Sequence, residues 1–265
     1  MDSQRQQLSL LGWGTARGDR PSIDALRKTL PAWAPAGTAG HFLKYADEQT
    51  VMAVAALDQA IRTQELPSLE FAKWAIIAAP RFIGRIAGTA TLARYSRGGG
   101  PAISPHVIPQ HSLHSISGAL SILLASKMPN FGVGGTSHSL TEGLVASLTF
   151  PFVDCQGIWL VATSWEPEPQ IDEQGNCINE PVCLAAALAF QMAAPAVRCG
   201  TLRFEERRGL QPRSEAQATT ETADLCRRLA ATASGGPAVA SSWSFAGNRI
   251  VLEVNQPARV KSLAA

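Results

Sequence analysis

The sequence carries little charge of either sign. Its 265 residues have a formal net charge of +2 at pH 7, and 17% of them are charged. Nucleic-acid binding needs Lys and Arg gathered on one face or along one helix, and the sequence has neither such a stripe nor an acidic tail. The composition therefore favours a protein or a small molecule as partner. With 46% hydrophobic residues, the chain can bury a substantial core, which predicts one domain with appended elements.

The cysteines are few, odd in number and widely spaced, and no C-x-x-C pair occurs. Neither a disulfide framework nor a zinc site is indicated, because both rely on regular cysteine spacings. We expect reduced, mostly buried thiols and no metal ion or other cofactor. The five cysteines are Cys155, Cys177, Cys183, Cys199 and Cys226.

Long apolar runs are also missing. The longest charge-free apolar stretch, residues 181–197, is interrupted by Gln191 and Pro195 and falls short of the roughly 20 residues that a membrane-spanning helix requires. The first twelve residues carry Asp2 and Arg5 before only a short apolar stretch, unlike a secretory signal. We therefore expect a cytoplasmic protein without a membrane span.

Helical and strand patterns alternate along the chain. Residues 8–15 predict a strand and residues 46–63 a helix, because apolar residues such as Val51, Val54 and Ile61 recur at helical spacing. The run KWAIIAAP has the length of a buried strand, and RFIGRIAGTATLARYSR is predicted to be helical despite two glycines. GIWLVATSW and VCLAAALAFQ are nearly continuous apolar strands, typical of strands covered by helices on both faces. The prediction is an α/β fold with a layered sheet.

The last quarter of the chain predicts a strand, TLRFEER, then a helix over residues 219–234 capped by Thr219 or Thr220. Two strands follow, VASSWSF and RIVLEV, and the residues between them, Ala246 to Asn248, are a hairpin signal. We assign residues 1–198 to the main domain. Residues 199–256 form a strand-helix-hairpin that either completes the sheet or is appended to it, and residues 257–265 form a tail.

The centre of the sequence carries the most informative motifs. SPHVIP, SISGALSI, MPN, FGVGGT and SHSLTEGL follow one another as loop, helix, turn, glycine-rich strand and second helix. This layout resembles a β-ketoacyl synthase around its nucleophile. With YADEQTVMAVAALDQAI and WAIIAAP upstream and GIWLVATSWEPEP downstream, the likeness covers about residues 8–190. It is similar to the β-ketoacyl-synthase-like N-terminal domain proteins, some of which resemble chain-length factors of aryl polyene and polyketide synthesis. The resemblance implies half of a thiolase-like fold, with α-β-α layers and a mixed sheet.

The sequence departs from that family at the nucleophile. Ser137 stands at the elbow, the turn between the glycine-rich strand and the next helix, where a ketosynthase carries cysteine. A serine hydroxyl is scarcely ionised near neutral pH, whereas a thiol at a helix N-terminus is readily converted to thiolate. All five histidines lie at or before the elbow, and nothing downstream matches the family's catalytic histidines. They are His41, His106, His111, His114 and His138.

The resemblance therefore implies a non-condensing subunit like a chain-length factor. It would pair with a complete ketosynthase, or with itself, in fatty acid or polyketide synthesis, and would not condense acyl chains alone. One alternative is a serine acyltransferase or thioesterase that uses Ser137 with His111 or His114 as base, since His138 is adjacent on the helix and poorly placed. Another is an inert homodimeric scaffold, in which Ser137 only caps the following helix.

The resemblance also implies an interface and a pocket. A helix over residues 110–126 and the strand over residues 130–135 would contact the partner, through His111, His114, Asn130, Gly132, Val133 and Gly134. Met128, Phe131 and Leu140 would line a pocket for the growing acyl chain. His111 and His114, three apart on one face of that helix, also have a spacing found in metal sites, but no third ligand is evident. Finally, four arginines either contact an acyl carrier protein or form a solvated face: Arg81, Arg85, Arg94 and Arg97.

Overall fold

The computed structural model describes residues 7–63, 66, 71–105, 107–151, 153–192, 199–206 and 221–255. Within these ranges one sheet of eight strands runs through the molecule, in the order β3-β2-β4-β5-β1-β6-β8-β7. β2 pairs in parallel with both β3 and β4, and each of the other neighbouring pairs is antiparallel. The strands are β1 (Gln7–Gly18), β2 (Trp74–Pro80), β3 (Asn130–Gly132), β4 (Gly157–Glu166), β5 (Val182–Gln191), β6 (Gly200–Glu206), β7 (Val239–Phe245) and β8 (Asn248–Val254).

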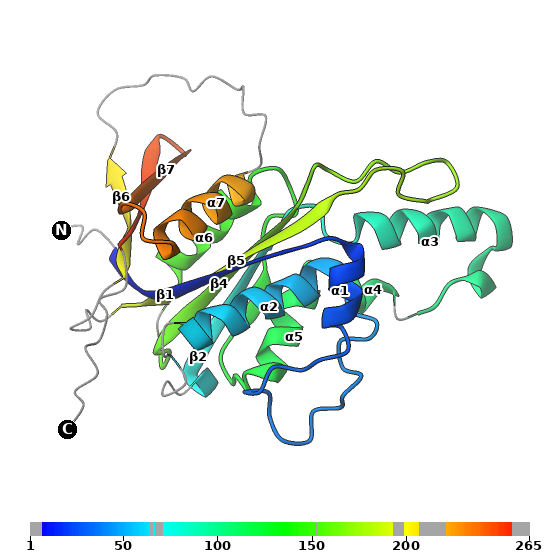
Figure 1. Ribbon diagram of the computed structural model, residues 1–265, viewed down its shortest axis with the longest axis horizontal. Helices are drawn as coiled ribbons and strands as arrows, with labels where there is room; N and C mark the ends of the chain where they lie inside the picture. Colours follow the sequence, from blue (N-terminus) through cyan, green and yellow to red (C-terminus); the bar gives the residue numbers. More distant parts are fainter. Residues whose placement is uncertain are drawn as a thin grey trace.

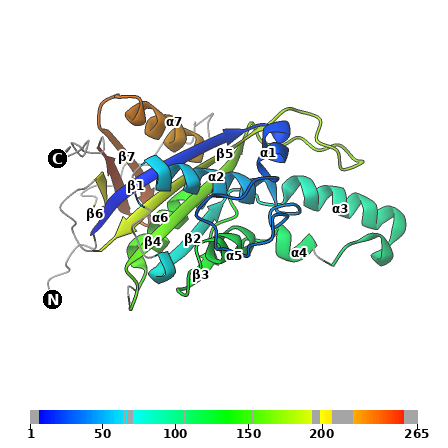
Figure 2. The same cartoon turned by 60° about the horizontal axis from the view of Figure 1, so that its bottom comes forward.

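Helices cover both faces of this sheet (Figure 1). α2 and α5 pack on one face, and α6 and α7 pack on the other. α3 extends away from the sheet, as both views show (Figure 2). The described helices are α1 (Arg20–Leu26), α2 (Glu48–Thr63), α3 (Arg85–Gly98), α4 (Val107–Gln110), α5 (His114–Leu123), α6 (Ser139–Thr149) and α7 (Glu221–Ala233). The predicted α/β class, with a mixed sheet between helical layers, is confirmed.

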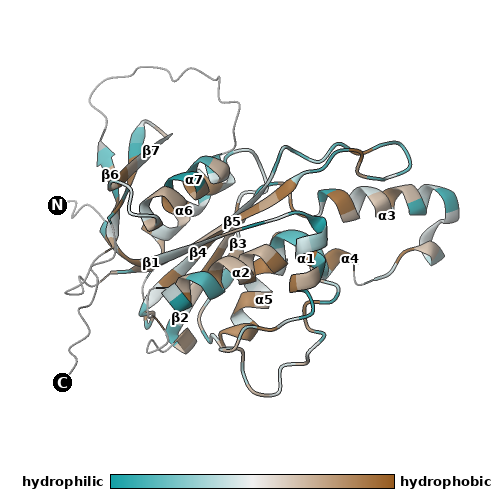
Figure 3. Ribbon diagram, viewed as in Figure 1, coloured by the Kyte–Doolittle hydropathy of each residue, from teal (hydrophilic) through white to brown (hydrophobic). Residues whose placement is uncertain are grey.

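The central strands are buried on both faces. All seven residues of β2 are buried, and alternate residues point to opposite sides because side chains in a strand alternate. Trp74, Ile76 and Ala78 join the core under α2 and α5, whereas Ala75 and Ile77 join the core under α6. Figure 3 shows hydrophobic residues along these strands, between the helices. The apolar runs in the sequence are nearly continuous because helices cover these strands on both faces, as predicted.

α2 lies unusually close to β1. A Cβ atom added at Gly14 would overlap the backbone of Ala56 and Ala60 on α2. On the neighbouring strand Gly14 pairs with Ala187, and the sequence there is Ala185-Ala186-Ala187. Small residues on the strands and on the helix therefore allow the helix backbone to approach the sheet directly.

Two predicted elements differ from the structure. The helix expected over residues 110–126 is shorter, since α5 runs from His114 to Leu123, and a break separates it from α4, which ends at Gln110. The Ser115 hydroxyl stabilises the break by accepting from the Ser112 amide (2.8 Å) and donating to the Pro109 carbonyl (2.9 Å). β3 ends at Gly132 instead of residue 135, and the chain then turns through Gly134 and Gly135, whose φ angles are +84° and +82°.

The strands after residue 199 continue the sheet beyond β1, through β6, β8 and β7. The predicted hairpin joins β7 to β8, and Ala246 and Gly247 have φ angles of 46° and 80°, as a two-residue type I′ turn requires. Thr219, Thr220 and the proposed tail lie outside the described residues. The boundary after residue 198 stays a prediction. Among the described helices, none is both long and apolar enough to cross a membrane.

The close contact at Gly14 generates a stability prediction. Gly14→Ala should lower the free energy of unfolding by about 1–3 kcal/mol, since the added methyl group forces α2 away from β1. Gly88→Ala is the control, because a Cβ in that part of α3 meets nothing within 4 Å and alanine favours a helix by roughly 0.5–1 kcal/mol. Urea denaturation followed by circular dichroism measures both. Equal effects would contradict the close packing.

Candidate functional site at the ends of the parallel strands

The candidate site lies where β2, β3 and β4 end. Because these three strands are parallel, the loops after Pro80, Gly132 and Glu166 leave the same edge of the sheet, which is where α/β sheets commonly bind ligands. A broad, open cavity of about 550 Å³ lies here. It is lined by Phe82, Ile83, Arg85, His111, Leu113, Gly134 and Gly135.

The elbow between β3 and α6 depends on glycine. A Cβ at Gly134 would lie 2.8 Å from the Ser139 Cα atom, and one at Gly135 would lie 2.9 Å from the Leu113 side chain. The Gly135 amide donates to the Pro80 carbonyl at 3.1 Å, which fixes the elbow against the end of β2. The glycines thus serve packing as well as the positive φ angles.

Ser137 lies exposed in this elbow, one residue before the N-cap of α6. The prediction that Ser137 is the N-cap is wrong, because His138 occupies that position. Thr136 stabilises the turn instead. Its hydroxyl accepts from the His138 amide and donates to Glu142 Oε1, both at 3.2 Å.

A buried carboxylate orients His111. The His111 Nδ1 atom lies 3.0 Å from Asp47 Oδ2, and the Asp47 side chain is 3% exposed. Asp47 directly precedes α2, and its Oδ1 accepts from the Gln49 amide at 2.9 Å, as an N-cap does. Sequence reasoning missed this pair, since 64 residues separate its members. The sequence signal concerned Asp47 alone: an aspartate directly before a run of apolar residues at helical spacing is typical of an N-cap.

The same end of α2 is joined to the sheet by a buried amide. The Gln49 side chain accepts from the Thr163 hydroxyl (2.6 Å) and donates to the Arg81 carbonyl (3.0 Å). Gln49 and Thr163 are fully buried, and buried polar groups are stable only when they are hydrogen-bonded. These contacts hold the ends of β2 and β4 and the start of α2 in one arrangement.

His114 lies elsewhere. It lines a separate cavity of about 240 Å³ with Phe42 and Leu43, and its Nδ1 atom is 3.2 Å from the Ser117 hydroxyl of its own helix. His111 precedes that helix, so the expectation that the two histidines share one helix face is wrong. Over the residues that the structure describes, no group of three His, Cys, Asp or Glu side chains could hold a metal ion.

Neither candidate base is hydrogen-bonded to Ser137 in the described chain. His111 is bonded to Asp47, and His114 is bonded to Ser117. His138 is 74% exposed and lies 3.6 Å from Glu221 of α7. The roles assigned to Ser137, His111 and His114 stay predictions.

The three residues expected to line an acyl pocket gather under α6. Leu140 is 1% exposed and belongs to the core, and Met128 and Phe131 are partly buried against the same core. The ring of Phe131 stacks on Phe150 with centroids 6.3 Å apart. Their role in binding an acyl chain stays a prediction, because all three side chains already have a structural role.

Two of the four predicted surface arginines are engaged. Arg81 and Arg85 contact Glu168 at 2.7 and 3.4 Å. Burial raises the pKa of Glu168, and the two arginines oppose that rise. Arg94 and Arg97 instead lie exposed on α3, and their hydrogen bonds to the described residues are local, to Thr91 and Ala93.

Charge is distributed unevenly around this site. The sequence contains no Asp or Glu from Phe71 to Thr141, although that stretch includes four arginines and two lysines. α3 lies within it and exposes Leu92 and Tyr95, at 68% and 56%. The projecting helix is therefore basic, with apolar side chains between its charges.

The C-terminal part of the chain also reaches the elbow helix. Glu221, at the start of α7, accepts from the Thr141 hydroxyl at 2.9 Å and from the Thr141 amide at 3.3 Å. A carboxylate is favourable at a helix N-terminus, so Glu221 stabilises the first turns of α6 and α7 together.

The sequence matches no protein-family model and no curated protein sequence. Among solved structures, a β-ketoacyl synthase from Burkholderia phymatum STM815 is similar with a TM-score of 0.59 and 10% identity, over 96% of this chain and 100% of that chain. The complex of the ketosynthase ApeO with its chain length factor ApeC, from Xenorhabdus doucetiae, contains a chain that is similar with a TM-score of 0.54 and 14% identity. That match covers 93% of this chain and 98% of the other.

The chain has the fold of a β-ketoacyl synthase. The predicted thiolase-like architecture is thereby confirmed, and the two matched chains are nearly as long as this one. A type II polyketide ketosynthase in complex with its acyl carrier protein, AntDE with AntF, is similar with a TM-score of only 0.46 at 14% identity. This chain spans 64% of that matched chain, and 71% of this chain is covered.

The contacts of Asp47 yield a stability prediction. Asp47→Ala should lower the free energy of unfolding by about 0.5–2 kcal/mol, because α2 loses its N-cap and His111 loses its partner. Asp47→Asn keeps an acceptor for the Gln49 amide and should cost less. Urea denaturation of both variants gives the comparison, and equal losses would show that the Asp47 charge, not its capping geometry, stabilises the site.

Proposed function

We propose that this chain is a non-condensing, chain-length-factor-like subunit that pairs through the edge of β3 with a complete ketosynthase. The observation that carries the proposal is the elbow, which retains its glycines and its position between β3 and α6 but presents an exposed serine without a bonded base. The ketosynthase-like fold over nearly the whole chain supports the same assignment.

The free edge of β3 supports a partner strand. Because the Pro129 carbonyl and the Val133 amide bond to β2, the backbone groups of Asn130 and Gly132 point outward. β3 is the last strand at this end of the sheet, and an unpaired edge is a template for another strand. Asn130 Oδ1 is buried and has no hydrogen-bond partner in the described chain. A partner could supply a donor to an acceptor that otherwise costs about 1–3 kcal/mol to bury.

The basic helix α3 supports an acidic carrier protein as a further partner. Arg94 and Arg97 project into solvent on either side of Tyr95, on a helix without acidic residues. Complementary charge speeds encounter and selects the partner more than it adds affinity. In this assignment α3 receives the carrier, and β3 contacts the ketosynthase.

Asn130→Pro tests the edge. Proline removes the outward N–H of Asn130 without breaking the ladder to β2, so it should abolish pairing. The tagged chain, purified from its native cells, is expected as a one-to-one complex in native mass spectrometry. Its partner should be a ketosynthase that carries the cysteine and histidines absent here. Asn130→Ala is the matched control, since it keeps the backbone donor; it should retain the complex, weakened only by the loss of the Oδ1 contact.

Two results would contradict the proposed pairing with a ketosynthase through β3. A homodimer in place of the complex would support the scaffold alternative, and a complex that survives Asn130→Pro would place the interface away from β3. Unchanged secondary structure in both variants, measured by circular dichroism, is required for either conclusion.

One observation favours a serine acyltransferase or thioesterase as the second candidate. His111 lines the open cavity, and the buried Asp47 orients it, in the way a base of a catalytic triad is oriented. If this function holds, a fluorophosphonate probe should label the chain at Ser137, and Ser137→Ala or His111→Gln should abolish labelling. Labelling that survives Ser137→Ala, or no labelling at all, excludes this site. We expect no labelling.

A further inference from the structure

A second open cavity lies on the other face of the sheet, between β1, β5 and α7. Its volume is about 460 Å³, within the ~300–1,000 Å³ range of small-molecule sites. Val182 and Leu184 of β5 form part of its floor. The cavity is separated from the β3 edge, because β2, β4 and β5 lie between β3 and β1 in the sheet.

The hollow exists because α7 presents small side chains to this part of the sheet. Ala223, Cys226 and Ala230 line the cavity, and their spacing of three and four residues places them on one stripe of the helix. Leu225 and Leu229, on the neighbouring stripe, are buried in the core. Leu225 and Leu229 thus hold α7 against the core, whereas the small side chains of the neighbouring stripe leave the space beside them unfilled.

The helix wall is apolar. Burial raises the pKa of the Cys226 thiol to about 12, so this side chain is neutral near pH 7 and behaves as a small hydrophobic group. Apart from Thr15, the uncharged side chains around the cavity are Ala, Val, Leu and Cys. The interior therefore suits a hydrocarbon surface.

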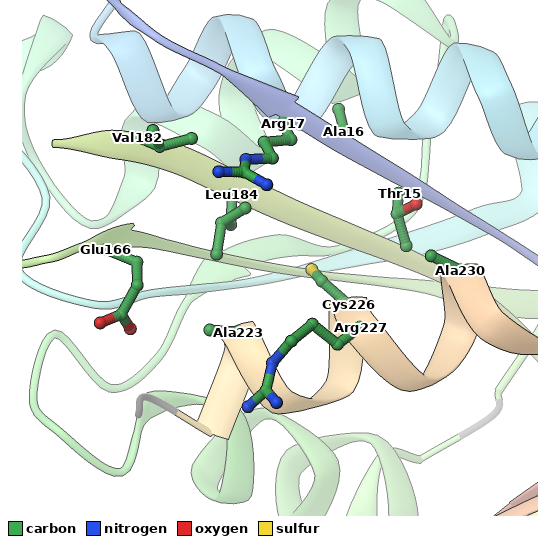
Figure 4. A pocket seen from close by; sticks show the side chains of 10 residues that line it. All are labelled: Thr15, Ala16, Arg17, Glu166, Val182, Leu184, Ala223, Cys226, Arg227 and Ala230. Atoms are coloured by element: carbon green, nitrogen blue, oxygen red, sulfur yellow. The ribbon is translucent and has the colours of Figure 1, made fainter. Parts of the chain in front are cut away.

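Charged groups lie among apolar side chains at one end of the cavity. Figure 4 shows the charged ends of Arg17, Glu166 and Arg227 around Leu184 and Ala223, and Thr15, Cys226 and Ala230 toward the other end. The lining thus contains two arginines and one glutamate.

Arg17 is the cation available to a ligand. It is exposed at the end of β1 and has no ion pair within the described chain. Arg227 by contrast lies 3.4 Å from Asp224 of its own helix. A guanidinium presents a planar fork that matches a carboxylate.

We propose that this cavity binds an amphipathic monoanion, with its single carboxylate at Arg17 and its apolar body between Leu184 and the small side chains of α7. The lining combines a guanidinium without an ion pair in the described chain with apolar side chains, as an amphipathic carboxylate requires. The site belongs to the chain whether or not β3 pairs with a ketosynthase.

Calorimetric titration of the full chain with decanoate and with uncharged decanol tests the site. Decanoate should bind more tightly than decanol. Arg17→Gln should weaken decanoate about tenfold, the loss of one charge-assisted hydrogen bond, and should leave decanol unchanged. Arg94→Gln, an exposed arginine on α3, is the matched control and should bind both as the parent chain does.

Two variants fill the hollow. Cys226→Leu and Ala230→Leu should each abolish decanoate binding, and because Ala230 is exposed, its variant should fold normally. Absence of decanoate binding to the parent chain, or equal binding to Ala230→Leu, overturns the site. Equal weakening by Arg17→Gln and Arg94→Gln overturns the role of Arg17. None of these results bears on the complex probed by Asn130→Pro, so the two proposals fail independently.

Discussion

The close approach of α2 to β1 is the contact on which the rest of the structure depends. It is possible because Gly14 has no side chain, because Ala56 and Ala60 face it, and because Ala187 lies beside it. A helix that lies this deep covers β1, β4 and β5 together and becomes almost wholly buried along one side. Such packing leaves the helix little freedom to rotate or slide, since interiors are as dense as organic crystals.

The position of α2 in turn sets the chemistry at its N-terminus. Asp47 and Gln49 reach the ends of the parallel strands only because the helix starts there, and each satisfies groups that would otherwise be buried without partners. His111 receives its orientation from Asp47 and so depends, through α2, on Gly14. The close packing at Gly14, in the middle of the sheet, thus determines the geometry of the site at the sheet edge.

How far the sequence predicts this molecule depends on the range of each interaction. α2, β2, β4 and β5 follow from local patterns, because period and apolar run length are properties of neighbouring residues. The break between α4 and α5 does not, since it depends on one hydroxyl of Ser115 returning to Pro109. The Asp47–His111 pair joins segments far apart in the chain, and the pattern before α2 indicates only that Asp47 caps a helix, not that it contacts His111. The cavity under α7 is harder still to foresee, because it arises from volume that Ala223, Cys226 and Ala230 fail to fill.

The elbow shows why a similar backbone fold does not by itself imply similar chemistry. Gly132 approaches the Leu113 carbonyl so closely that a Cβ would overlap it, and Gly134 and Gly135 pack against Ser139 and Leu113. The need for glycine at these positions is the same whether the following residues carry a thiol, a hydroxyl or no reactive group. Function must therefore be argued from the groups at the site. Here those groups are an exposed serine, an imidazole bonded to a buried carboxylate, and a strand edge with an unsatisfied Asn130 oxygen. In the described chain the serine hydroxyl has no hydrogen-bonded base, whereas the outward backbone donors and acceptors of β3 can pair without rearrangement. On this ground we propose that the site binds a partner and does not catalyse a reaction.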